Sequence, residues 1–203
     1  MKFFKALFRI TALLLLVITF GCSDPVPKTI HIQPLGKVSP IYIQMVKQSI
    51  RSFYGFNCVI KPQIAVTNAM LSRVKKRIDA TKALSSNKTF ENLLFITERD
   101  ICHYNKEKAS PEYGIMGLGS ISGKTCIIST FRLKFDALKK GVSQQKILER
   151  LKKVALHEIG HNLGLAHCTN NDRCLMTAAK GSVEQVDLMK VWLCEKCKQK
   201  IEK

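Results

Sequence analysis

Two stretches of the chain carry apolar residues every three to four positions, a spacing that places them on one face of a helix. The first predicted helix covers residues 40–54 and has Ser39 as its N-cap. Its apolar positions are Ile41, Met45, Ile50 and Phe53. The second helix is longer, with Ser143 as its N-cap, and runs through Gly164. Its apolar positions are Ile147, Leu151, Val154 and Ile159. Further helices are predicted over residues 69–84, 97–103 and 182–201.

Shorter apolar or alternating stretches predict five strands. Three of them are rich in branched apolar residues, and they cover residues 29–33, 57–66 and 92–97. Residues 114–122 are rich in glycine and suit an edge strand, followed by an inner strand over residues 124–129. This order of helices and strands predicts an α/β (α+β) fold, in which a mixed twisted sheet packs on helices.

The first 22 residues follow the order of a secretory signal. Lys2, Lys5 and Arg9 precede an apolar run over residues 10–20, which is shorter than the about 17 to 25 residues that a bilayer span needs. The run ends in Gly-Cys, so the segment resembles a bacterial lipoprotein signal in which Cys22 is lipidated and becomes the first mature residue. Secretion with cleavage nearby is the alternative, and a buried N-terminal helix of a cytosolic protein is a third interpretation.

This reading divides the chain into three parts. Residues 1–22 are the signal or lipoprotein segment, and residues 23–28, with two prolines, form a short tether. Residues 29–203 are enough for a single domain with a core of its own. We expect the mature protein to be a monomer held by its lipid to the membrane of the bacterial cell envelope. A secreted or periplasmic location is the alternative.

Basic residues outnumber acidic residues by 33 to 15, which gives a formal net charge of +18. Three positive charges belong to the signal segment, so 30 basic and 15 acidic residues leave +15 on the remainder. No nucleic-acid recognition module and no basic stripe with interleaved aromatic residues accompany this charge, so no nucleic-acid partner is expected. A solvated basic surface, drawn to anionic lipid headgroups or to acidic polymers of the envelope, accounts for it better.

The run from His157 to His167 reads HEIGHNLGLAH and predicts a catalytic metal site. His157 and His161 are four residues apart, so one helix face presents both to the same ion. Glu158 is turned about a quarter of a turn away, within reach of a water on that ion. Gly164 ends the helix because glycine adopts a left-handed conformation without strain, and the turn returns His167 as a third imidazole. Three neutral imidazoles leave the fourth zinc position for water, as a catalytic zinc site requires.

Four cysteines follow in two close pairs, Cys168 with Cys174 and Cys194 with Cys197. This composition is the ligand set of a closed, structural zinc site. Two disulfides formed after export are the alternative. The other cysteines beyond the signal segment are expected to be small buried apolar residues, and they are Cys58, Cys102 and Cys126.

The histidine run followed directly by cysteine, then C-x-M and C-x-x-C, resembles the archaemetzincins, which are zinc peptidases of the metzincin type. The resemblance extends over about residues 30–197. One departure is the gap between Cys168 and Cys174, which has five residues where the resemblance leads us to expect four. The resemblance implies a metzincin-like fold, with the active-site helix on the mixed sheet and a C-terminal segment stapled by zinc.

The resemblance also implies the role of each motif residue and a total of two zinc ions per chain. The ligands of the catalytic zinc would be His157, His161 and His167. The ligands of the structural zinc would be Cys168, Cys174, Cys194 and Cys197. Glu158 would be the general acid/base in peptide-bond hydrolysis by zinc-activated water. Met176 would be the Met-turn residue beneath the three histidines, although an isolated methionine ordinarily fills gaps in a core.

The sequence therefore predicts a zinc-dependent metallopeptidase that acts on peptide or protein substrates. The glycine-rich strand over residues 114–122 could pair with an extended substrate through backbone hydrogen bonds. His103 and Tyr104 are conceivable substrate contacts, and exposed loop positions are the simpler interpretation of both. The alternative function is a non-catalytic envelope binding protein that retains the metal fold. Glu158 favours catalysis, because a protein without catalytic activity has no chemical need for that carboxylate.

Overall fold

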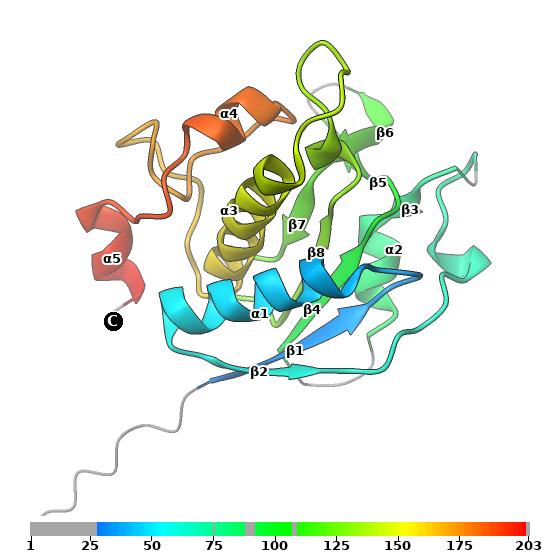
Figure 1. Cartoon of the computed structure of the whole chain (residues 1–203), viewed down its shortest axis with the longest axis horizontal. Coiled ribbons are helices and arrows are strands. Elements are labelled where there is room, and N and C mark those ends of the chain that lie inside the picture. Colours follow the sequence, from blue (N-terminus) through cyan, green and yellow to red (C-terminus); the bar gives the residue numbers. More distant parts are fainter. Residues whose placement is uncertain (1–27, 75, 88–91, 107–108, 202–203) are drawn as a thin grey trace, which may run out of the picture.

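The computed structural model describes residues 28–74, 76–87, 92–106 and 109–201 (Figure 1). The predicted signal segment, with Cys22, and residues 23–27 of the predicted tether lie outside the described residues. Among the helices that the structure does describe, none combines the length and the apolar character needed to cross a bilayer.

The larger sheet has five strands, and only its last strand runs against the others. In spatial order the strands are β2 (Asn57–Ile60), β1 (Thr29–Pro34), β4 (Leu93–Thr97), β8 (Thr125–Ser129) and β7 (Gly117–Gly119). The pairs β2–β1, β1–β4 and β4–β8 are parallel, whereas β7 is antiparallel to β8. The short, glycine-containing β7 therefore forms one edge of a mixed sheet, as the sequence predicted for this region.

Both faces of this sheet are covered, which explains why all five residues of β4 are buried. Helices α1 (Pro40–Tyr54) and α3 (Gln144–Asn162) pack together on one face, and Figure 1 shows them in front of the sheet. The strand residues in contact with that helix layer are Ile30, Ile32, Leu94, Ile96, Cys126 and Ile128. The opposite face packs on α2 (Ala80–Ser85) and on a smaller sheet through Leu93, Phe95 and Ile127.

The smaller sheet leads the chain directly into the edge strand of the larger one. Its spatial order is β3 (Ile78–Asp79), β5 (Ile101–Asn105) and β6 (Ser110–Ile115). Strands β5 and β6 are antiparallel, and His103 lies opposite Tyr113. Only Met116 separates β6 from β7, so the two sheets meet beside helix α3.

Helix α3 is fixed at both ends by its own sequence. The Ser143 side chain accepts a hydrogen bond from the backbone N–H of Lys146 at 3.3 Å, as an N-cap does. At the other end Gly164 has φ +92°, and the N–H of Leu165 donates to the carbonyl of Gly160. This hydrogen bond closes a Schellman turn, which reverses the chain directly after the second histidine of the motif.

A buried arginine ties α3 to α4 (Val183–Leu188). Arg150 is only 3% exposed and donates two hydrogen bonds to the Asp187 carboxylate, at 2.9 and 2.8 Å. Its third nitrogen donates to the carbonyl groups of Leu133, in the 3-10 turn Arg132–Lys134, and of Phe135. A second 3-10 turn, Asn68–Met70, and the helix α5 (Glu195–Ile201) complete the described elements.

Two of the helices predicted from local pattern are wrong. Residues 69–84 form the end of a 3-10 turn, the strand β3 and the short helix α2, because Arg77 bonds to Asp100 and Asp79 caps α2. Residues 97–103 contain the start of strand β5 instead of a helix, since β5 pairs with β6. The predicted strands over residues 29–33, 92–97 and 124–129 are confirmed, as are the helices over residues 40–54 and 143–164.

Three further elements are shorter or more divided than predicted. Strand β2 ends at Ile60, and residues 61–66 contribute only a single bridge from Ile64, since Pro62 has no N–H to donate to a ladder. Residues 114–122 are divided between β6 and β7. The predicted helix over residues 182–201 is interrupted between α4 and α5, because the interrupting segment pairs with the loop that contains Leu175.

Candidate active site and metal centres

The three motif histidines meet at one point beside the edge of the larger sheet. Helix α3 presents His157 and His161, and the Schellman turn brings His167 back to them. The ring centroids are 4.6 Å apart for His157 and His161, 5.4 Å for His157 and His167, and 4.8 Å for His161 and His167. One ligand nitrogen of each ring lies within 4.8 Å of the other two. These separations fit a single metal ion shared by three imidazoles.

Backbone carbonyl groups orient two of the three imidazoles. Nδ1 of His157 lies 2.7 Å from the carbonyl oxygen of Leu175, and Nδ1 of His161 lies 2.7 Å from that of Leu165. A carbonyl accepts only, so Nδ1 carries the proton and Nε2 keeps its lone pair for a metal.

Burial also keeps the three imidazoles neutral. Burial first, and then the neighbouring His161, lower the pKa of His157 to about 3. Burial lowers the pKa values of His161 and His167 as well. Neutral imidazole is the form that ligates zinc, so the three residues have the electrostatics of a ligand set before any ion is bound.

Glu158 is buried between the histidines and the edge strand β7. A Cβ at Gly117 would lie 2.5 Å from its Oε1, and a Cβ at Gly119 would lie 2.6 Å from its backbone oxygen. Burial raises the pKa of Glu158 to about 8, and a hydrogen bond from the backbone N–H of Gly119 opposes this shift. The two glycines therefore let β7 lie directly against the carboxylate, a requirement that sequence reasoning did not identify.

Met176 lies against helix α3 at Gly160. It is fully buried, and a Cβ at Gly160 would lie 2.5 Å from its sulfur. The carbonyl of Met176 accepts a hydrogen bond from the N–H of Cys168 at 2.8 Å. Met176 thus packs on the segment of α3 between His157 and His161, and its main chain is bonded to the residue after His167.

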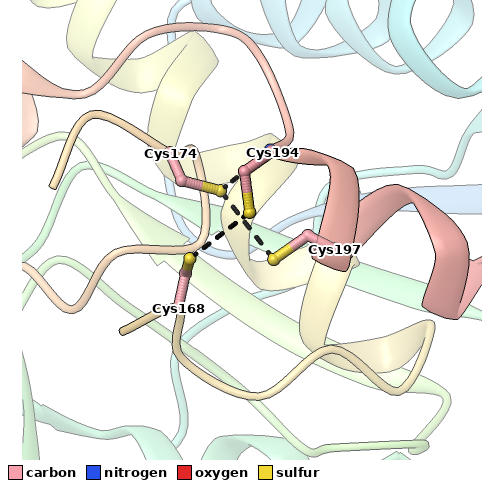
Figure 2. A group of neighbouring side chains, drawn as sticks. All are labelled: Cys168, Cys174, Cys194 and Cys197. Atoms are coloured by element: carbon pink, nitrogen blue, oxygen red, sulfur yellow. Dashed lines mark hydrogen bonds between the residues drawn. The ribbon is translucent and has the colours of Figure 1, made fainter. Parts of the chain in front are cut away.

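The four C-terminal cysteines form a second cluster, shown in Figure 2. The Sγ atoms of Cys168 and Cys194 are 3.6 Å apart, and those of Cys174 and Cys197 are 3.9 Å apart. A tetrahedral zinc site with Zn–S bonds of about 2.3 Å has S–S edges of about 3.8 Å, whereas a disulfide bond is about 2.05 Å long. The geometry therefore fits one tetrahedral zinc ion, and the cysteines among the described residues form no disulfide.

Backbone N–H groups point at these sulfur atoms, as they do around bound thiolates. The N–H of Cys194 donates to Sγ of Cys174 at 3.4 Å. Burial alone would raise the pKa of Cys168, but hydrogen bonds from the N–H groups of Asn170 and Asn171, together with those from neighbouring thiols, lower it to about 7. Burial raises the pKa values of Cys174 and Cys197, so Cys168 is the member of the cluster whose ionisation these N–H groups favour most. Cys102 and Cys126 are buried elsewhere, as predicted, whereas Cys58 is only partly buried.

The two clusters are joined by very short stretches of chain. His167 and Cys168 are adjacent in sequence, and Cys174 directly precedes Leu175, whose carbonyl orients His157. The C-terminal segment also holds Leu175 in place, because the N–H of Leu175 donates to the carbonyl of Trp192 at 2.8 Å. The loop between His167 and Met176 is therefore held at both ends by residues of the cysteine cluster.

A cavity of about 320 Å³ opens onto the three histidines and Glu158. Strand β7 forms one wall, and residues 179–181 with Val186 and Met189 form another. His103 lines this cavity from strand β5, so the loop interpretation of this residue is wrong. Tyr104 also lies in β5, is 57% exposed and does not line the cavity. Sequence reasoning missed Tyr113, which lines the cavity opposite residues 179–181.

Comparisons with known proteins agree with this geometry. Residues 38–203 match the sequence pattern of peptidase family M54. The chain is similar to the archaemetzincin of Methanocaldococcus jannaschii, with 31% identity over 174 residues that cover 85% of this chain and 92% of the relative. It is also similar to an archaemetzincin of Halobacterium salinarum, with 29% identity, 85% of this chain and 98% of the relative.

A solved structure has the same fold. The crystal structure of the archaemetzincin from Archaeoglobus fulgidus, complexed with malonate, superposes with a TM-score of 0.72 and 28% identity, over 85% of this chain and 99% of that one. The mixed α/β architecture is therefore that of an archaemetzincin. With its sequence pattern, its relatives and its fold in agreement, the chain belongs to peptidase family M54, the archaemetzincin family of zinc metallopeptidases.

Proposed function

We propose that His157, His161 and His167 hold the catalytic zinc of this peptidase and that Glu158 is its general acid/base. The observation that carries this assignment is the convergence of three neutral imidazoles, two of them with Nδ1 committed to a carbonyl, around a buried carboxylate. Zinc in such a site supplies Lewis acidity and brings the pKa of water to about 7.

Glu158 can take and return a proton because its environment holds the carboxyl group near the point of ionisation. Its pKa of about 8 results from burial, and a divalent cation on the neighbouring imidazoles would favour the carboxylate form. The carboxylate accepts a proton from water during attack on a peptide carbonyl and then returns it to the leaving amine. The N–H of Gly119 holds the carboxylate in place for both transfers.

We propose that an extended peptide binds along β7, since this strand forms the edge of the larger sheet next to Glu158. Backbone groups of an edge strand can pair with an added strand. The opposite wall of the cavity includes the apolar residues Ala179, Val186 and Met189, which suit an apolar side chain of the substrate.

We further propose a structural zinc ion on Cys168, Cys174, Cys194 and Cys197, which makes two ions per chain. The near-tetrahedral sulfur separations and the N–H group directed at Cys174 support this second ion. It would fix the C-terminal segment to the loop that follows the catalytic histidines.

The test of these assignments combines activity with metal content. Purified reduced protein should contain close to two zinc ions by elemental analysis, and His161→Ala should contain close to one. Glu158→Gln should keep both ions and its stability while hydrolysis of a peptide library falls by about 100- to 10,000-fold. Glu149→Gln is the matched control, because Glu149 is an exposed position on the same helix. Parent-like hydrolysis by Glu158→Gln would show that another group is the base.

We propose that the protein is exported and anchored through lipid on Cys22, with the excess of basic residues assisting at an anionic membrane surface. The support is the order of charge, apolar run and Gly-Cys within the first 22 residues. Labelled fatty acid should enter the parent and not Cys22→Ser, and the variant should leave the membrane fraction. Equal membrane association of both proteins without label would refute lipid anchoring. Secretion with cleavage nearby would instead give unlabelled soluble protein.

A further inference from the structure

Two segments that are far apart in the sequence meet where they line the active-site cavity. Tyr113 extends from strand β6, and its hydroxyl donates a hydrogen bond to the carbonyl of Lys180 at 2.9 Å. Lys180 lies four residues after Met176, in the segment that leads to α4. The contact therefore joins the sheet side of the cavity to its opposite wall.

The backbone at the far side of this contact is shaped to receive the tyrosine. Lys180 has φ +50°, a conformation that residues with a side chain rarely adopt, and Gly181 follows with φ +79°. A Cβ at Gly181 would lie 2.6 Å from the Tyr113 hydroxyl oxygen. We refer to Tyr113, Lys180 and Gly181 together as the Tyr113 strap.

One residue of the strap, Gly181, lies between the active-site cavity and a second cavity. All three residues of the strap line the active-site cavity, and Gly181 also lines a neighbouring cavity of about 530 Å³. The second cavity is polar on one side, where Arg77 and Arg132 share the Asp100 carboxylate, and the residues after Gly181 form its other side. The two cavities are thus neighbours with Gly181 in the wall between them.

We propose that the Tyr113 strap limits the length of peptide that the active site accepts on the side of β6. A substrate that continues past the strap on this side would have to break the Tyr113 hydrogen bond to enter the second cavity. Short extensions on this side, and any length on the other side, do not meet this barrier. Tyr113 is a positioning residue in this proposal, which rests on the proposed peptidase function and assigns the length of its substrates.

The test measures binding, so that it does not depend on turnover. Two series of peptide hydroxamates, extended one residue at a time toward the N-terminal or the C-terminal end, are titrated calorimetrically into the zinc-loaded protein. In the parent, only one of the two series should meet the strap. In that series the affinity should stop rising, or should fall, once the peptide extends more than a few residues. Tyr113→Phe has no hydroxyl to bond to the Lys180 carbonyl, so a long peptide has no such hydrogen bond to break. The variant should therefore bind the longer members of that series about 2- to 10-fold more tightly. The gain in affinity over the parent should increase with the length of the peptide and be smallest for the shortest members.

Two further variants complete the experiment. Tyr104→Phe is the control, because Tyr104 lies on the neighbouring strand and does not line the cavity. Gly181→Ala displaces the tyrosine from the other side and should move the length profile in the same direction as Tyr113→Phe. Thermal unfolding shows whether each variant is folded.

The outcomes separate the strap from the proposed catalytic function. If both hydroxamate series in the parent gain affinity steadily with length, the strap does not limit the cleft. An unchanged profile in a folded Tyr113→Phe would also overturn the proposal. If instead the length limit and its relief are observed while the parent hydrolyses no peptide, the strap stands and the proposed catalytic function falls.

Discussion

Adding a single methyl group at Gly119 should lower catalysis, because this glycine lies against Glu158. It lies in β7, directly against α3, and its N–H donates to the Glu158 carboxylate. The Cβ of an alanine there would lie 2.6 Å from the backbone oxygen of Glu158 and 3.1 Å from Oε2. The backbone oxygen belongs to the main chain of a buried helix and cannot rotate away. In Gly119→Ala the edge strand must therefore move.

The size of the effect of Gly119→Ala follows from the contacts that are lost when β7 moves. An extra methyl group in a packed contact costs about 1 to 3 kcal/mol of unfolding free energy. Moving β7 also removes the N–H from the Glu158 carboxylate and shifts the strand along which the substrate is proposed to bind. General-base catalysis contributes about 100- to 10,000-fold, so we expect kcat/KM of Gly119→Ala to fall by at least about tenfold. Zinc content should not change, because the carbonyl groups that orient His157 and His161 belong to Leu175 and Leu165, which lie outside β7.

The assay compares kcat/KM on a fluorogenic peptide with zinc content and with urea unfolding of the same preparations. Gly141→Ala is the matched control, because a Cβ at that glycine meets no atom within 4 Å. Activity of Gly119→Ala within about twofold of the parent, at unchanged stability, would show that β7 tolerates a side chain against Glu158. The argued contact between the strand and the catalytic carboxylate would then be wrong.

Three other substitutions test the surroundings of the site. Gly160→Ala should lower the free energy of unfolding by about 1 to 3 kcal/mol in urea titrations, because its Cβ would lie 2.5 Å from the sulfur of Met176. Asp187→Asn should cost about 3 kcal/mol near pH 7 by the same measurement, since it leaves the buried guanidinium of Arg150 without its carboxylate. Burial alone would raise the pKa of Asp187, but hydrogen bonds from basic partners lower it overall, so its stabilisation is present at neutral pH and is lost as the pH falls below about 4. The melting temperature of the parent should therefore approach that of the variant in acid. Cys194→Ser should weaken catalytic zinc binding by about 10- to 100-fold in a chelator titration, and a parent-like curve would show that the two clusters are independent.

The parts of the fold that could be predicted are those whose cause is local in the sequence. Helix α3 has an N-cap serine, an apolar stripe and a terminating glycine within its own length, and all three act as predicted. Strand β4 is a continuous apolar run because both of its faces are covered. The histidine cluster was predictable for the same reason, because helical spacing and one turn at Gly164 are enough to bring the three imidazoles together.

The parts that could not be predicted depend on partners distant in the chain. The local pattern of residues 97–103 predicts a helix, but pairing with β6 makes β5 a strand. The Tyr113 hydroxyl finds its acceptor 67 residues later, and no spacing rule connects the two positions. Gly117 and Gly119 appear in the sequence only as signs of an edge strand. Their contact with Glu158 becomes visible once β7 is placed against α3.

The arrangement of the two clusters suggests why the cysteines lie where they do. An imidazole site needs its ligands held in one orientation, and for His157 this is done by the carbonyl of Leu175, which belongs to a loop without regular secondary structure. In this loop the position of Leu175 depends on contacts with other segments, such as its N–H donating to the carbonyl of Trp192. Cys174 directly precedes Leu175, and the residue that directly follows His167 is another cysteine of the cluster, so an ion held by the four sulfurs would fix both attachments at once. The C-terminal segment, which supplies the other two sulfurs, would then help to position the proposed catalytic residues.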